Sequence, residues 1–185
     1  MQTNFDKHSV KNPSLEIKSK EHYDFIGDVF DSYIKFDDFM KRKDLFVVVS
    51  RNTKNEIIGL TLVRETLINS TIKVKKKVEK DKNGKPKTDK IEWIDKITGN
   101  FLVYRVIYTL INKHYRGKGY NQILLDFLYQ HAKSVKNVKY ITANIRESNK
   151  TSTKSFLKNG FKISNRITKP YKNDEKKIRV IKFIK

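Results

Sequence analysis

A long apolar strand pattern that runs directly into a glycine-rich turn and a helix constrains the fold of this chain most. Residues 101–112 read FLVYRVIYTLIN, which is almost wholly apolar and is typical of a strand covered on both faces of a sheet. The turn follows as RGKGYN at 116–121, and apolar residues then recur on one helical face at Ile123, Leu124, Phe127 and Leu128. This order predicts a central strand, a tight turn and a helix that packs back on the sheet.

The turn at 116–121 has the chemistry of a phosphate site. A strand that delivers a turn to the first residues of a helix leaves several backbone N–H groups directed at one point. Gly117 and Gly119 let the backbone approach a diphosphate closely, and Arg116 and Lys118 add positive charge. The spacing GxxxxGK[ST] is absent, as is the dinucleotide pattern GxGxxG. The turn therefore predicts phosphate binding of another type.

The rest of the chain alternates between strand and helix patterns. Strands are expected at 14–18, 45–51, 56–65, 138–145, 161–167 and 178–184. Apolar spacings of three and four predict helices at 21–40, with a break near 35–38, and at 150–158. A length of 185 residues suits one domain over 1–185.

Residues 71–97 form a separate basic segment. Two alternating runs flank Asn83-Gly84, a strong hairpin signal, which predicts an inserted β-hairpin. Within it, residues 71–90 carry nine lysines against three acidic residues, a local charge of about +6; the lysines are Lys73, Lys75, Lys76, Lys77, Lys80, Lys82, Lys85, Lys87 and Lys90. Together with Trp93, this charge suits DNA or RNA as a partner, and a solvated hairpin whose Trp93 covers the core or a dimer interface is the alternative.

The overall composition bears on partners and surroundings. A net charge of +21 favours anionic partners and disfavours polycationic acceptors, although the lysine-rich usage also fits an AT-rich genome. The chain has no cysteine, which fits a reducing, cytoplasmic setting. No export signal or membrane anchor is visible, and a monomer and a homodimer are both compatible with the sequence.

Two segments resemble the GNAT acetyltransferase family. The first is the strand followed by Arg116-Gly117-Lys118-Gly119, similar to the family's (R/Q)xxGx(G/A) signature. The second is Asn149 with a small residue three on, an aromatic residue seven on, and then Gly160-Phe161. The resemblance covers roughly 101–161 and implies an α/β fold of mixed α+β type, with a mixed, mostly antiparallel sheet flanked by helices.

The resemblance also implies a cofactor site and a reaction. Acetyl-CoA, or another acyl-CoA, would lie on the turn and along the preceding strand, and an acceptor amine would attack the thioester directly. The residues assigned to the cofactor in this way are Leu110, Ile111, Arg116, Gly117, Lys118, Gly119, Tyr120, Asn121, Asn149, Ser152 and Phe156.

The chain departs from the family pattern at three positions. Asn121 stands where Gly or Ala is usual, and Phe156 replaces a tyrosine that in many members protonates the leaving thiolate. Arg105 occupies the position of a glutamate base. Tyr108, His114 and Glu147 are candidate catalytic residues by proximity in sequence, and their alternatives are a core residue, a solvated turn residue and a helix-start charge, respectively.

The sequence is compatible with several acceptors. Arg105 would suit an acidic or phosphorylated substrate, and an internal ion pair is its alternative. A nucleic acid, or a substrate bound to one, competes with protein amines and with small amines. A catalytically degenerate protein of the same fold that binds nucleic acid or a protein partner is the rival function. The histidines show no metal-ligand spacing, so no metal is expected.

Overall fold

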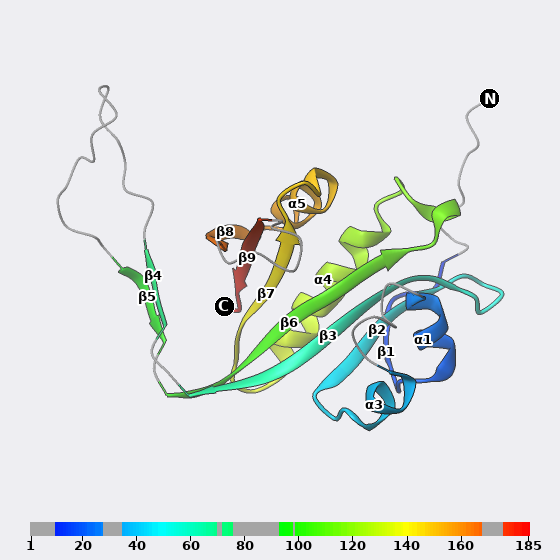
Figure 1. Ribbon diagram of the computed structural model, residues 1–185, viewed down its shortest axis with the longest axis horizontal. Coiled ribbons are helices and arrows are strands. Elements are labelled where there is room, and N and C mark those ends of the chain that lie inside the picture. The colour runs from blue at the N-terminus through cyan, green and yellow to red at the C-terminus, as the bar shows by residue number, and fades with distance from the viewer. Residues whose placement is uncertain (1–9, 28–34, 70–71, 76–92, 98, 168–175) are drawn as a thin grey trace.

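The computed structural model describes residues 10–27, 35–69, 72–75, 93–97, 99–167 and 176–185. Seven strands form one sheet in the order β1-β2-β3-β6-β7-β9-β8 (Figure 1). Their bounds are β1 Ser14–Glu16, β2 Leu45–Arg51, β3 Ile57–Asn69, β6 Asn100–Ile111, β7 Val138–Arg146, β9 Lys177–Phe183 and β8 Lys162–Ile167. The pair β6 and β7 is parallel, and the other neighbours in this sheet are antiparallel. The expected mixed, mostly antiparallel sheet flanked by helices is confirmed.

One face of the sheet carries α4 (Tyr120–Ser134), the helix that follows the glycine turn. Leu124, Leu125 and Leu128 of α4 are fully buried with Tyr104 and Val106 of β6. Because α4 contacts β2, β3, β6 and β7, it closes this face over the middle of the sheet. The apolar face of α4 therefore packs on the sheet, as the spacing of its apolar residues predicted.

The opposite face is covered at one end by two short helices, α1 (Lys20–Ile26) and α3 (Phe36–Lys41). Tyr23, Ile26 and Phe39 from these helices are buried against Val47 of β2 and Leu62 of β3. Figure 1 shows both helices beside β1 and β2 and away from β7. The helices therefore cover the β1–β3 part of this face.

The strands β6 and β7 pair along only part of their length. Their register runs from Leu102–Val138 to Val106–Ala143, whereas β6 continues to Ile111 and β7 to Arg146. A β-bulge at Ile107 bends β6 where this pairing ends. Figure 1 shows the two strands close at one end and apart at the other. The last part of β6 thus borders an opening in the sheet, and it leads straight to the glycine turn.

The helix expected at 21–40 is interrupted near 35–38 as predicted, since α3 begins at Phe36 after an extended Lys35. Its first part is shorter than expected, because α1 ends at Ile26 with Gly27 as its C-cap, at a φ of 67° that glycine adopts readily. The basic segment contributes β4 (Ile72–Lys75) and β5 (Trp93–Ile97), paired antiparallel apart from the main sheet. Its Asn83-Gly84 turn lies outside the described residues, and its status as an insertion stays a prediction.

The α4 face contains a half-buried histidine, His131, that should make stability depend on pH. The ring of His131 stacks on Tyr104 at 5.9 Å, and the Tyr104 hydroxyl lies 3.4 Å from Nε2 of His131. Burial lowers the pKa of His131 and raises that of Tyr104 to about 12. An unfolded histidine titrates near pH 6.5 and so binds more protons than the folded one just below that pH. The contribution of neutral His131 to the free energy of unfolding is therefore fully present above about pH 6.5 and is lost as the pH falls.

Urea unfolding at pH 7.5 and pH 5.5 measures this effect. We expect the wild-type chain to lose stability between these values and His131→Gln to lose less. The carboxylates of Glu16, Glu21 and Asp44, whose pKa values are lowered by hydrogen bonds to arginine, contribute only below about pH 4.5. Lys133→Gln on the same helix should lose as much stability between pH 7.5 and pH 5.5 as the wild type. If His131→Gln loses as much stability as the wild type between these pH values, His131 is not the source of the pH dependence.

Candidate active site

The glycine turn has the backbone geometry of an anion cradle. Gly117 and Gly119 have φ values of 78° and 87°, in the region that L-residues with side chains avoid. A Cβ added to either glycine would meet no atom within 4 Å, so the backbone conformation, rather than crowding, requires glycine here. Gly119 is the N-cap of α4 and makes no side-chain capping bond. The helix therefore presents its first N–H groups to open space.

Aromatic rings hold this turn in place. The short 3-10 helix η2 (Lys113–Tyr115) precedes it, and the ring of Tyr115 packs edge-on against Tyr120 at 5.8 Å. Asn52 of the β2–β3 turn donates through Nδ2 to the Tyr115 hydroxyl at 3.2 Å. Tyr120 is buried, which raises the pKa of its hydroxyl. The start of α4 is thereby fixed relative to β3 and β6.

The two cations of the turn fold back on the preceding segment. Arg116 donates through Nε to the carbonyl oxygen of Ile111 at 3.0 Å, and Lys118 donates through Nζ to that of His114 at 2.9 Å. The Lys118 ammonium also lies 5.5 Å from the centre of the Tyr115 ring. Arg116 and Lys118 are both exposed. Their hydrogen bonds tie the turn to the segment before it, and their charges make the turn positive.

Asn121 directs its side chain toward the next helix. Its Nδ2 donates to the Ser155 hydroxyl at 2.7 Å, which links α4 to α5 (Lys150–Lys158). The Asn121 Oδ1 atom is buried, and no hydrogen-bond partner for it occurs among the described residues. The amide therefore joins two helices, and only the Asn121 backbone remains directed at the cradle.

The second motif builds the start and the buried face of α5. Asn149 is the N-cap of α5, and its Oδ1 accepts from the Ser152 backbone N–H at 3.0 Å. Phe156 is buried, with its ring edge-on to Phe161 at 4.9 Å. Asn149 is exposed beside the end of β7. Contacts of Asn149, Ser152 and Phe156 with a cofactor stay predictions.

The end of β6 is shaped by a glycine that sequence reasoning missed. Leu110 and Ile111 are half-buried and pack on opposite faces of the sheet. Gly59 of β3 pairs with Ile111, and a Cβ at Gly59 would lie 2.6 Å from Ile111 Cδ1 and 3.0 Å from Leu124 Cδ1. Gly59 therefore lets α4 and the end of β6 approach β3 closely. In the sequence, a single glycine within a strand pattern is the signal for such a close approach.

The three candidate catalytic residues lie at different depths. Tyr108 is half-buried on β6, just beyond the last pair with β7, and contacts the core under α1 and α3. His114 is exposed in η2, beyond the end of β6. Glu147 follows the end of β7, where its N–H donates to the Lys176 carbonyl oxygen at 2.8 Å. The fold does not gather these side chains at one point, and only Tyr108 lies on the diverging part of β6.

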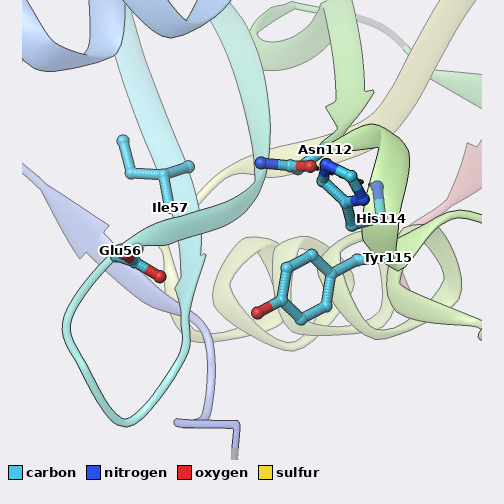
Figure 2. Close-up of a pocket in the computed structure, with 5 residues that line it drawn as sticks. All are labelled: Glu56, Ile57, Asn112, His114 and Tyr115. Atoms are coloured by element: carbon cyan, nitrogen blue, oxygen red, sulfur yellow. Dashed lines mark hydrogen bonds between the residues drawn. The ribbon is translucent and has the colours of Figure 1, made fainter.

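A surface hollow of about 530 Å³ lies on the β3 side of the β6 end. Figure 2 shows Glu56 and Ile57 on one side of it and Asn112, His114 and Tyr115 on the other. The Tyr115 hydroxyl points toward the β2–β3 turn in this view. Because β3 and β7 flank β6 on opposite sides, this hollow is separate from the opening between β6 and β7.

The described residues were also compared with the requirements of a metal site and of a membrane-spanning helix. A group of three or more His, Cys, Asp or Glu side chains that could hold a metal ion does not occur among them. None of the helices within the described ranges is long and apolar enough to cross a bilayer.

Residues 14–161 match the Acetyltransferase (GNAT) family. The chain therefore belongs to this family, and it is an acetyl-CoA-dependent N-acetyltransferase with acyl-CoA as its cosubstrate. The matched range includes both motifs and the diverging strands. No curated protein matched the chain by sequence.

Solved structures share the fold at low sequence identity. Arabidopsis thaliana NAA60 in complex with acetyl-CoA has a TM-score of 0.65 and 9% identity, covering 93% of this chain and 99% of its own. A chimera of the Vibrio cholerae spermidine N-acetyltransferase SpeG and hSSAT has a TM-score of 0.62 and 11% identity, with coverages of 94% and 96%. The ribosomal-protein-S18-alanine N-acetyltransferase of Escherichia coli has a TM-score of 0.57 and 9% identity, with coverages of 93% and 94%.

Proposed function

We propose that the chain binds acetyl-CoA with the diphosphate on residues 116–121 and the pantetheine arm along the end of β6, and that it acetylates a primary amine directly. The observation that carries this proposal is the separation of β6 from β7 beyond the Val106–Ala143 pair. It leaves backbone groups of β6 beside an opening that ends at the glycine cradle. A backbone N–H on this part of β6 would polarise the thioester carbonyl.

The cradle fits a diphosphate on several counts. The uncapped N-terminus of α4 provides backbone donors, and open space lies in front of Gly117 and Gly119. Arg116 and Lys118 supply positive charge within the same turn. The Asn121 side chain, engaged with Ser155, does not compete for this space.

The reaction needs no nucleophilic side chain. The neutral amine nitrogen bonds to the thioester carbon and loses one proton to solvent, the carbon–sulfur bond breaks, and the thiolate that leaves takes up a proton, so that an amide and free coenzyme A are formed. We assign the donation of that proton to Tyr108. Its place on the diverging part of β6 supports this role, whereas Phe156 has no proton to give and is packed in the core. His114 belongs to the diphosphate end of the strand, several residues from Tyr108.

Acetyl-CoA titration by calorimetry, followed by mass spectrometry of an amine panel, tests the function. We expect saturable binding and a mass gain of one acetyl group on an amine. Tyr108→Phe should lower kcat by about 100-fold with little change in acetyl-CoA affinity, the size typical of a lost proton donor.

The matched control is Tyr104→Phe, which removes a hydroxyl from the opposite face of β6 and should leave kcat near the wild-type value. Binding without transfer to any amine would favour the rival, a degenerate protein of this fold. Equal kcat values for Tyr108→Phe and the wild type would remove Tyr108 from the mechanism.

The structural neighbours leave the acceptor undecided. They include a spermidine N-acetyltransferase and an enzyme for an alanine of a ribosomal protein, so one fold serves small polyamines and protein amines. Acetylation of a nucleic acid or a substrate bound to one stays a prediction from the basic segment, since residues 76–92 lie outside the described part.

A further inference from the structure

Two arginines lie on one face of the sheet beside the point where β6 and β7 separate. Arg105 of β6 pairs in register with Thr142 of β7, and Arg179 of β9 pairs with Asn144 of β7. Because Thr142 and Asn144 are two residues apart on one strand, they share a face, and so do their partners. Arg105 and Arg179 therefore flank β7 on the same face.

That face is the one opposite α4. Tyr104 and Val106, the neighbours of Arg105 along β6, are buried with residues of α4, so Arg105 points to the other side. Val106 is the last β6 residue paired with β7, and Asn144 is the first β7 residue beyond that pairing. The two arginines thus lie at the apex of the opening.

Strand register and the charges felt by Tyr140 place Arg105 and Arg179 over the same part of the face. Arg179 donates through Nε to Asn144 Oδ1 at 3.3 Å. The pKa of the Tyr140 hydroxyl is raised by burial, and the positive charges of Arg105 and Arg179 both oppose that rise. Tyr140 is two residues before Thr142 on the same face, so both charges lie near one ring.

These two arginines have no acidic partner within the described ranges. Arg42, Arg51 and Arg64 each form an ion pair with a carboxylate, whereas no carboxylate of the described residues does so with Arg105 or Arg179. Both side chains belong to half-buried residues. Half-buried guanidinium groups without a carboxylate are ready to bind an anion, for which their planar donors are well suited.

We propose that the acceptor is a small amine that also carries an anionic group, a carboxylate or a phosphate, and that Arg105 and Arg179 bind this group while the amine reaches the thioester. The inference rests on the proposed function. Since α4 covers one face, the acceptor approaches from the other, past these two side chains. A polyamine would meet two like charges at the same place, in addition to the net charge of +21.

Matched pairs of amines test the proposal through thiol release from acetyl-CoA. The pairs are 4-aminobutyrate with butylamine and phosphoethanolamine with ethanolamine, and spermidine is the polycationic case. We expect kcat/KM to be at least about 10-fold higher for the anionic member of one pair, as for a hydrogen-bonded ion pair. The preferred pair distinguishes carboxylate from phosphate. Added salt should reduce the preference.

Arg105→Gln and Arg179→Gln should each lower kcat/KM for the amine with the anionic group by about 10- to 100-fold, and leave kcat/KM for its partner without that group nearly unchanged. Lys133→Gln on α4 removes the same charge from the opposite face and should change neither. Calorimetric titration with acetyl-CoA, expected to match the wild type in all three variants, verifies that they are folded.

Three outcomes would overturn the proposal. They are equal use of both members of each pair, an equal loss for both members in Arg105→Gln, and preferred acetylation of spermidine or of a nucleic acid. If acetyl-CoA binds but none of these amines causes thiol release, the inference is overturned as well, whereas the proposed function is contradicted only if no member of the wider amine panel gains an acetyl group.

Discussion

Gly119→Asp is expected to weaken acetyl-CoA binding by about 100-fold or more in calorimetry. The substitution places a carboxylate in the open space before the N-terminus of α4, where the diphosphate is proposed to lie. Repulsion between like charges at close range is worth roughly 2–4 kcal/mol at the effective dielectric of a protein surface, and each 1.4 kcal/mol is about tenfold in affinity. The backbone at φ 87° adds strain for any side chain.

Two control variants separate charge from strain. Gly119→Asn has nearly the same shape without the charge and tolerates a positive φ better than most residues, so its affinity should lie between those of Gly119→Asp and the wild type. Gly99→Asp places the same side chain at φ 96°, with no atom within 4 Å of its Cβ, at the other end of β6 from the turn, and should bind normally. Undiminished binding by Gly119→Asp would exclude the cradle as the diphosphate site.

Gly59→Val is expected to lower both the free energy of unfolding and the affinity for acetyl-CoA. Its Cβ would lie 2.6 Å from Ile111 Cδ1, 3.0 Å from Leu124 Cδ1 and 3.4 Å from the Leu110 carbonyl oxygen, so the side chain would occupy space that these residues already fill. Overpacking of this kind costs roughly 1–3 kcal/mol. The displaced residues include the end of β6, so the proposed pantetheine track should shift with them.

Thr66→Val is the matched control on the same strand. The Thr66 hydroxyl is buried, and no hydrogen-bond partner for it occurs in the described part of the chain, so an apolar replacement should leave stability unchanged or raise it. Urea unfolding and acetyl-CoA titration of both variants provide the comparison. Gly59→Val with wild-type values in both measurements would show that β3 and β6 accommodate the side chain.

The strand, turn and helix at the centre of the site could be predicted because their signals are local. Apolar residues at 101–112, two glycines in the turn and an apolar stripe from Ile123 onward each act within a few residues. The structure has β6, a turn with Gly117 and Gly119 at positive φ, and α4 at these positions. The same holds for the helix predicted at 150–158, which the structure has as α5, Lys150–Lys158.

Other features depend on residues distant in sequence and could not be predicted. No local pattern indicates that β9 lies between β7 and β8, which brings Arg179 to the side of Asn144. The burial of Phe156 against Phe161, and the reach of Asn121 to Ser155, follow from how α5 packs.

By itself the sequence determined the glycine cradle, the helix behind it and the family, because backbone preferences and short-range spacing specify them. Only the tertiary structure decided where β6 and β7 separate, which candidate residue borders that opening and which arginines flank it. Strand order and register are set by packing between segments far apart in the chain. The chemistry of the acceptor side is therefore a property of the assembled sheet.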